Sequence, residues 1–163
     1  MLWIVGIIMP AIYLFTYYKA GLYADFGLQV YYLLAAVYGW LAWKFWKRKK
    51  KQEMPITHVP VNLFSYSLAA FFLFWILIYV LLITFTDSNV PVSDSFVNAL
   101  SIVGLWMLSR KFVEQWLVWL VVDAFSCALY FYKGIPFTAS LYFVYTVIAI
   151  FGYRKWLRIM NLP

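Results

Sequence analysis

Long uninterrupted blocks of apolar residues constrain this chain more than any other feature of its sequence. Each block has roughly 17 to 24 residues, and a helix of about 20 residues crosses a hydrocarbon core of about 30 Å. Of the 163 residues, 66% are hydrophobic and only 12% are charged, which is too little charge for the surface of a soluble domain. The sequence therefore predicts an all-α integral membrane protein with six transmembrane helices. We place these spans at residues 2–18, 23–46, 63–85, 92–108, 112–132 and 136–153.

The basic residues indicate how the chain is oriented. Most of them lie in short connections between apolar blocks, above all in residues 47–51 and at Arg110 and Lys111. An excess of Lys and Arg in short loops marks the cytoplasmic side of a membrane protein. Because membrane orientation explains the net charge of +7, we expect no nucleic-acid partner.

Residue types that are rare in the chain exclude several kinds of site. Cys127 is the only cysteine and His58 the only histidine, so an intrachain disulfide, a cysteine cluster and a His-based zinc site are excluded. The sequence has no Gly-x-x-x-x-Gly-Lys-Ser/Thr loop for nucleotide hydrolysis. We therefore expect a protein that is not an enzyme and that has no cofactor and no metal. A transporter is the favoured class, and a non-transporting membrane assembly subunit is the alternative.

The sequence contains an internal repeat. Residues 3–43 align without a gap with residues 116–156. Apolar composition alone would produce some matches, but it would not keep pairs of Gly, Tyr and Trp in one register. We interpret the alignment as a parallel structural repeat, an arrangement found in transporters whose substrate sites lie between the repeats near the membrane midplane. Identical pairs include Trp3/Trp116, Tyr32/Tyr145, Gly39/Gly152 and Trp43/Trp156.

The repeat predicts how the chain is organised. A further span precedes the second copy, and its counterpart in the first copy would lie before Met1. We therefore expect two three-helix units, with the first helix of the first unit missing, and a linker helix that lets both units run in the same direction. This is a 3+1+3 parallel-repeat, SWEET-like architecture. The predicted segments are 1–46 (first repeat, two of three helices), 47–62 (basic cytoplasmic loop), 63–85 (linker helix) and 86–163 (second three-helix repeat).

Polar side chains within the spans are the first candidates for a substrate site. A carboxylate near the bilayer centre costs about 2.5–3.5 kcal/mol on insertion scales, so it normally faces a cavity or the bundle interior. Asp25, Gln29 and Tyr32 share one helical face, and the repeat puts Tyr145 on the corresponding face of the other unit. Asp25 is equally compatible with an interfacial anchor or helix cap, and both tyrosines with packing, whereas a cavity better explains Gln29.

A second helical face carries Trp116, Trp119 and Asp123. Asp123 lies deep in its span and favours a cavity, while an interfacial aromatic belt competes as an explanation of Trp116. Asn98 and Trp106 on the preceding span are expected to line the same cavity, although Asn98 would also suit a bond to a neighbouring helix. Two aromatic planes near amide and carboxylate groups suit a flat, polar and cationic ring.

Several of these segments resemble the Pnu family of vitamin transporters, which includes nicotinamide riboside transporters. The most specific of them is the Trp-x-x-Trp segment 116–119, which follows a basic turn. Two positions depart from the family: residues 3–6 keep only the outer residues of its Trp-Pro-Phe-Gly motif, and Leu105 stands where many nicotinamide riboside members have a polar residue. The resemblance covers nearly the whole chain, at residues 23–32, 38–40, 109–111, 114–119, 122–123, 129–134 and 152–156.

The resemblance implies a function and its setting. Members of the family move an unphosphorylated vitamin precursor by facilitated diffusion, and a cytoplasmic kinase that need not touch the transporter traps it by phosphorylation. The resemblance also implies a multi-pass homotrimer in the lipid of the bacterial cytoplasmic (inner) membrane, with a cytoplasmic carboxyl terminus. We expect nicotinamide riboside as the substrate, for NAD synthesis, with a thiamine transporter of the same fold as the alternative. Trp116 and Trp119 are the implied substrate-binding residues, joined by Gln29.

Overall fold

The computed structural model describes residues 54–86 and 89–161, together with the backbone of 23–50 and the side chains of 29–46 within it. It also describes residues 8, 10–12, 14, 15 and 18, so most of the first predicted span lies outside the described residues. The described part is helical apart from turns, loops and one isolated β-bridge. Its long helices are α2 (Tyr23–Lys50), α3 (Val61–Phe85), α4 (Pro91–Ser109), α5 (Gln115–Tyr132) and α6 (Pro136–Met160).

Four of these helices, α3 to α6, are long and apolar enough to cross a membrane. The protein is an all-α membrane protein, as predicted. On α3, for example, only Ser67, Phe71 and Ile78 are buried, and most of the other apolar residues of the helix, such as Phe72 and Ile76, are exposed. An outward-facing apolar surface of this kind suits a lipid environment and not water.

Proline and glycine mark the ends of the helices. α4 begins at Pro91 and α6 at Pro136, where the missing N–H is no loss because the first turn of a helix has no acceptor for it. Between α5 and α6 the chain turns at Gly134, whose φ of 72° is free of strain only for a residue without a side chain. α2 continues to Lys50, so the first residues of the predicted basic loop are helical, in keeping with the good helix propensity of Lys and Arg.

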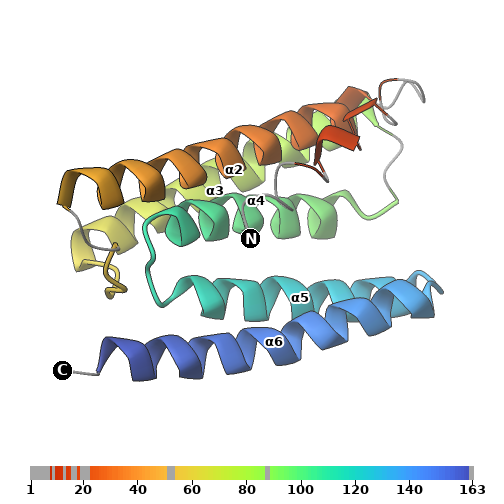
Figure 1. Cartoon of the computed structure of the whole chain (residues 1–163). Helices are drawn as coiled ribbons and strands as arrows, with labels where there is room; N and C mark the ends of the chain where they lie inside the picture. The colour runs from red at the N-terminus through yellow and green to blue at the C-terminus, as the bar shows by residue number, and fades with distance from the viewer. Residues whose placement is uncertain are drawn as a thin grey trace.

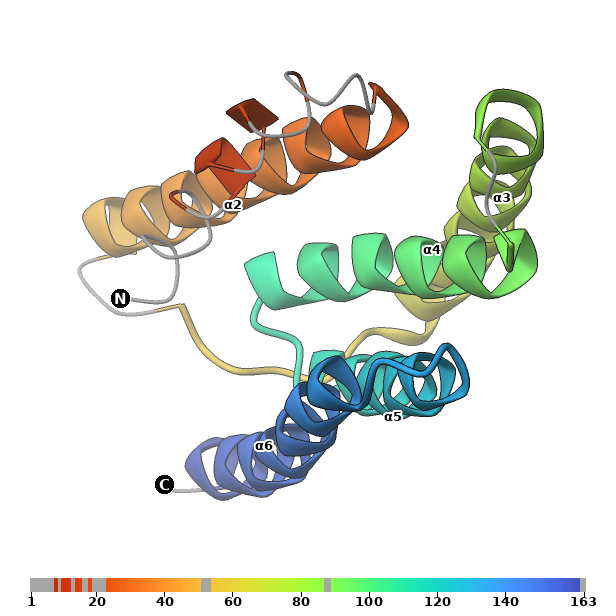
Figure 2. The ribbon, with the colours of Figure 1, turned by 90° about the vertical axis from the view of Figure 1, so that its right-hand side faces the viewer.

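The helices run alternately in opposite directions along one axis. α2, α4 and α6 run one way and α3 and α5 the other (Figure 1). α4 lies at the centre, packed against α2, α3 and α5, while α6 packs on α5 (Figure 2). We call the end with the α4–α5 turn and the carboxyl terminus the basic end, and the opposite end the far end. The basic end carries Arg110, Lys111, Arg154, Lys155 and Arg158.

The joint between α2 and α4 contains three side-chain hydrogen bonds, spread along the length of the helices. All three are donated by α2, and two of them end on backbone carbonyls of α4. At the basic end the ammonium of Lys111 also lies 4.6 Å from the centre of the Trp43 ring. The bonds are Tyr31 Oη to Ile102 O (3.3 Å), Tyr32 Oη to Asn98 Oδ1 (3.1 Å) and Trp43 Nε1 to Ser109 O (3.0 Å).

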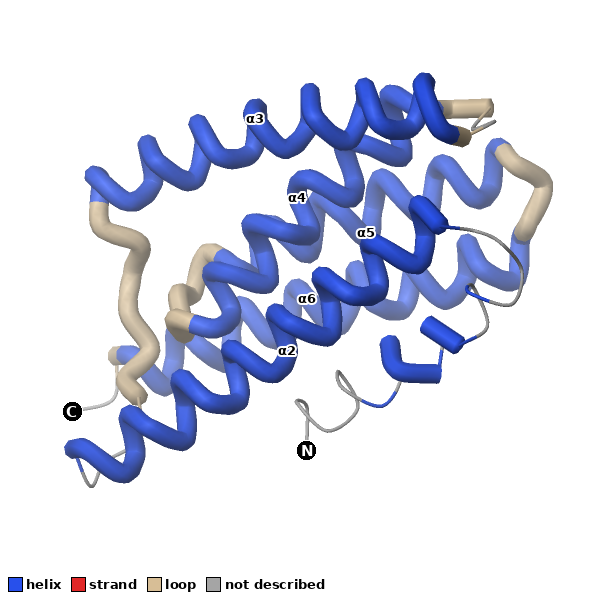
Figure 3. Tube along the Cα trace, turned by 90° about the horizontal axis from the view of Figure 1, so that it is seen from above, coloured by secondary structure: helices blue, strands red, loops and turns tan. Residues whose placement is uncertain are grey.

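The connection that leads into α3 is tied to the α4–α5 turn. We call residues 54–60 the strap; Figure 3 shows it as the loop at the start of α3. The backbone N–H of Thr57 donates to Lys111 O at 3.3 Å, and the Thr57 carbonyl accepts the N–H of Val113 at 3.0 Å. The carboxylate of Glu114, the residue before α5, lies 2.6 Å from His58 Nδ1 and accepts the backbone N–H of Val59 at 3.0 Å. The strap thereby fixes the turn from which α5 begins.

Candidate substrate cavity

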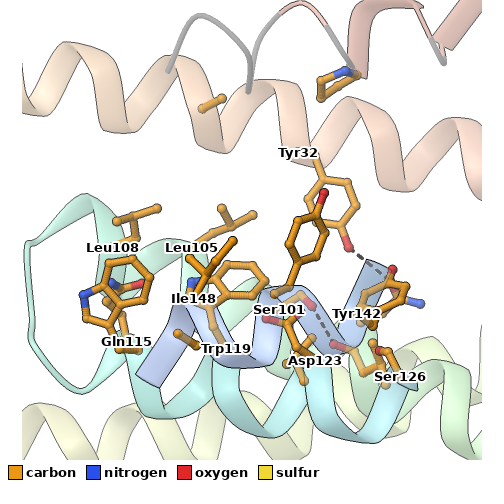
Figure 4. Close-up of a pocket in the computed structure, with 18 of the residues that line it drawn as sticks. Tyr32, Ser101, Leu105, Leu108, Gln115, Trp119, Asp123, Ser126, Tyr142 and Ile148 are labelled. Carbon is orange, nitrogen blue, oxygen red and sulfur yellow. Dashed lines mark hydrogen bonds between the residues drawn. The ribbon is translucent and has the colours of Figure 1, made fainter. Parts of the chain in front are cut away.

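A cavity of about 840 Å³ lies among α2, α4, α5 and α6 (Figure 4). Pockets for small organic molecules usually have about 300–1,000 Å³, so this cavity can hold a molecule of vitamin size. α2 makes no close backbone approach to α6, and side chains from both helices line the space between them. The bundle therefore encloses a binding space between α2 on one side and α4 to α6 on the other.

One face of α5 supplies several of the polar residues of the lining. Gln115, Trp119, Asp123 and Ser126 follow one another at spacings of four, four and three residues, which keeps them on one side of a helix. Figure 4 shows them in this order along α5, starting from the basic end. Gln115 is 1% exposed, Asp123 7% and Ser126 2%, so these groups are withdrawn from the outer surface.

Three buried polar atoms at the basic end of the cavity have no hydrogen-bond partner in the described part of the chain. They are Oε1 and Nε2 of Gln115 and Nε1 of Trp116. Since more than about 90% of buried polar groups in proteins are hydrogen-bonded, these atoms are expected to bond a ligand or water in the cavity. Among the described residues no hydrogen bond involves Asp123 either, so its carboxylate also remains open to a ligand.

Aromatic rings line both ends of the cavity. Trp43, Trp116 and Trp156 lie toward the basic end, and the last two meet edge to face with ring centres 5.6 Å apart. Toward the far end, Tyr130 and Tyr142 are stacked at 5.3 Å with an interplanar angle of 9°. Planar side chains with a polar edge can hold a flat ring and still offer hydrogen bonds.

The charge of the lining has one sign. Asp94 and Asp123 line the cavity, whereas no Lys, Arg or His does so among the described residues. Asp94 lies near the far end and its carboxylate is 3.3 Å from Lys133 Nζ. The cavity therefore offers carboxylates to a cation and no basic side chain of the described part to an anion.

Residues that the sequence repeat pairs with each other line the cavity together. Tyr32 and Ala36 of α2 correspond to Tyr145 and Ala149 of α6, and all four belong to the lining. Figure 1 shows that α2 and α6 run in the same direction. The third identical pair in the lining is Trp43 and Trp156.

Most of the residues selected from the sequence meet at this cavity. Gln29 and Trp106 are described but do not belong to its lining, and the side chain of Asp25 lies outside the described residues. Trp106 instead packs into the apolar core between α3 and α4, with its ring 5.8 Å from that of Phe112. The selected residues in the lining are Trp116, Trp119, Asp123, Tyr32, Tyr145 and Asn98.

The structure adds residues that were not selected as site residues from the sequence. Gln115 extends the face of Trp119 and Asp123 by one turn, so the spacing could have revealed it. Its place beside the basic turn made an interfacial position equally reasonable. Ser126 continues the same face in the other direction, and Ser101 of α4 also lines the cavity. Leu105 also lines the cavity, so the position at which the family resemblance leads us to expect a polar residue is apolar here.

The model of one protein family, described as "Nicotinamide mononucleotide transporter", matches residues 1–158. The chain belongs to this family. The resemblance to the Pnu transporters that the sequence motifs indicate is thereby confirmed, and the protein is a multi-pass membrane protein of a transporter family.

Two bacterial transporters illustrate what the chain is similar to. The chain is 26% identical to the nicotinamide riboside transporter PnuC of Escherichia coli over 176 residues, which cover 93% of this chain and 74% of the relative. It is 32% identical to the riboflavin/roseoflavin transporter RibM of Streptomyces davaonensis over 66 residues, 40% of this chain and 31% of the relative. The crystal structure of a vitamin B3 transporter PnuC matches with a TM-score of 0.69 at 20% identity, over 98% of this chain and 72% of that one, and thus shares the fold.

Proposed function

We propose that this protein carries nicotinamide riboside across the bacterial cytoplasmic membrane by facilitated diffusion. The observation that carries the proposal is the charge of the cavity, whose described lining contains two carboxylates and no basic side chain. Nicotinamide riboside is a pyridinium cation without phosphate. A phosphate monoester adds about −1.5 to −2 charges at pH 7 and would meet carboxylates, with no basic side chain in the described lining to pair with. The lining therefore favours the riboside over the mononucleotide after which the family is described.

The aromatic residues of the lining suit the pyridinium ring. We assign Trp116 and Trp119 as the planes that hold it, because cation–π attraction is strongest for Trp and grows where water is excluded. Asp123 contributes a negative charge on the same helix face. Tyr32, Tyr145 and Asn98 complete the polar wall of the proposed site. Gln29, Trp106 and Asp25 receive no role in this assignment.

The proposed transport step is a rocking motion of two parallel units. One unit comprises α4, α5 and α6, the other includes α2, and α3 acts as the linker between them. The shared direction of α2 and α6 and their matched lining residues support this division. The α2–α4 joint would be the contact that rearranges. By the positive-inside rule the basic end is cytoplasmic, where a kinase would trap the riboside by phosphorylation.

Thiamine is the second candidate, since it also pairs a flat cationic ring with the absence of phosphate. The first experiment is calorimetric binding of nicotinamide riboside, its mononucleotide and thiamine to the purified protein. We expect the riboside to bind at least ten times more tightly than the mononucleotide. Trp119→Ala should weaken this binding, while Trp40→Ala, on a half-exposed ring outside the lining, serves as the control. Binding of thiamine alone would move the assignment to thiamine, and binding of none would favour the assembly subunit.

Uptake into sealed vesicles tests the mechanism. Facilitated diffusion predicts that the riboside equilibrates across the membrane without any proton or sodium gradient. Accumulation above the external concentration, dependent on such a gradient, would contradict the uncoupled mechanism.

A further inference from the structure

The amide of Gln115 is the most unusual polar group of the cavity. It is almost fully buried at the start of α5, and neither its oxygen nor its nitrogen has a partner in the described part of the chain. A buried amide left unpaired is destabilising, because it has lost its hydrogen bonds to water without gaining others. A residue that retains such a group in a cavity of ligand size is placed to bond the ligand.

The groups along α5 have a definite order. From the basic end the cavity face presents an amide (Gln115), an indole (Trp119), a carboxylate (Asp123) and a hydroxyl (Ser126) (Figure 4). At a rise of about 1.5 Å per residue, the amide and the carboxylate are separated by about 12 Å along the helix axis, with the indole halfway. This is close to the length of an extended nucleoside with a substituted ring.

The order matches the sequence of groups in nicotinamide riboside. A carboxamide carries a donor and an acceptor side by side, as does the Gln115 side chain, so the two amides can form a pair of hydrogen bonds. A carboxylate is an acceptor only and suits the hydroxyl donors of a ribose. The indole of Trp119 lies at the level along the α5 axis at which the pyridinium ring would stack against it.

We infer that Gln115 sets the orientation of the ligand and the chemical selectivity of the site. Its amide pairs with the carboxamide of the ligand at the basic end, while the ribose lies toward Asp123. The inference rests on the proposed function and adds to it the direction in which the ligand lies. It assigns Gln115 the role of distinguishing a carboxamide from a bare ring or a carboxylate at that position.

A double-mutant cycle between protein and ligand tests the pairing. The variant is Gln115→Leu, which keeps the approximate size and removes both polar atoms, and the ligand pair is nicotinamide riboside and N-ribosylpyridinium, which lacks the carboxamide. We expect the unchanged protein to prefer nicotinamide riboside by about tenfold or more and Gln115→Leu to lose this preference while binding N-ribosylpyridinium as before. Equal weakening of both ligands, or retention of the preference, would overturn the assignment.

The other end of the ligand supplies a cross-check. Asp123→Asn should reduce the preference for the riboside over its 2′,3′-dideoxy analogue, and Gln115→Leu should leave that preference intact. The reverse pattern would overturn the orientation. If the unchanged protein binds no nicotinamide riboside, the proposed function fails together with this inference, whereas binding with the wrong pattern overturns the orientation alone.

The melting temperature in detergent without ligand shows whether the variant is folded. Because Leu removes an unpaired buried amide, we expect the melting temperature of Gln115→Leu to stay the same or rise. If it falls by several degrees, the amide is bonded within the protein or to a structural water, which contradicts a free ligand-binding group. Gln115→Met, which has the same length and no strong hydrogen-bonding atom, repeats the binding test with less change of shape.

Discussion

The indole ring of Trp116 fills the space in which Gly152 would carry a side chain. A Cβ atom at Gly152 would lie 2.6 Å from three atoms of that ring, a distance that real Cβ contacts do not reach. α6 therefore passes so close to α5 that only glycine leaves Trp116 its place beside the cavity. The glycine belongs to the site although it bonds nothing.

Gly152→Ala should displace the Trp116 ring and weaken riboside binding by about tenfold or more. Overpacking of this kind also costs typically about 1–3 kcal/mol of stability. Calorimetry and thermal unfolding measure the two effects. Gly104→Ala is the matched control, since a Cβ there would lie 3.1 Å from Val118 and 3.4 Å from Trp119, which a small shift relieves. Equal losses in both variants would contradict the explanation.

Asp123→Asn should weaken binding of the cationic riboside by about tenfold while weakening the mononucleotide less, because the variant removes a negative charge from the lining. Asp94→Asn should have a smaller effect on the riboside, since the Asp94 carboxylate already lies 3.3 Å from Lys133. Calorimetric titration of both ligands into both variants measures the selectivity. An unchanged ratio of the two affinities in Asp123→Asn would show that this carboxylate does not select by charge.

Trp43→Phe should lower the stability of the joint between α2 and α4, because it keeps an aromatic ring and removes the donor to Ser109 O. The net contribution of one such hydrogen bond is about 0.5–1.5 kcal/mol. Ser109→Ala is a comparison only: it leaves the accepting backbone carbonyl in place but removes a separate bond, from the Ser109 hydroxyl to Trp106 O at 2.6 Å. Thermal unfolding in detergent measures the effect, and an unchanged stability of Trp43→Phe would contradict the role of the bond.

Glu114→Ala should loosen the strap far more than His58→Ala does. The glutamate accepts both the Val59 N–H and the His58 ring nitrogen, whereas the His58 side chain is 60% exposed. Exposed ion pairs contribute about 0.2–1 kcal/mol, while a half-buried N–H left without an acceptor costs more. Hydrogen exchange at the Val59 amide provides the measurement. Faster exchange in His58→Ala than in Glu114→Ala would reverse the assignment.

The helices of this fold could be predicted from the sequence because a helix that crosses lipid needs a long apolar run. A helix predicted at 63–85 is observed as α3 at Val61–Phe85, and the span predicted from 136 begins at Pro136. The run of apolar residues does not say which face of a helix looks inward. For α4, which packs on three neighbours, this ambiguity made Trp106 a candidate for the cavity although it lies on the side of α3.

The cavity-lining face of α5 could be predicted from the sequence because the polar residues of this helix are few and regularly spaced. Trp119 and Asp123 both line the cavity, and one further turn leads to Gln115. What the sequence could not reveal is that the Gln115 amide is unpaired, because pairing depends on neighbours from other helices. For the same reason the clearance between Trp116 and Gly152 becomes visible only when α5 and α6 are packed together.

Two of the three bonds that α2 donates to α4 end on main-chain oxygens, those of Ile102 and Ser109. Every amino acid placed at those two positions brings the same acceptor. These two bonds therefore do not depend on which side chains α4 carries there, whereas they do depend on the side chains of Tyr31 and Trp43. This chain and PnuC of Escherichia coli differ at about three quarters of their aligned positions, and a main-chain acceptor is unaffected by such differences.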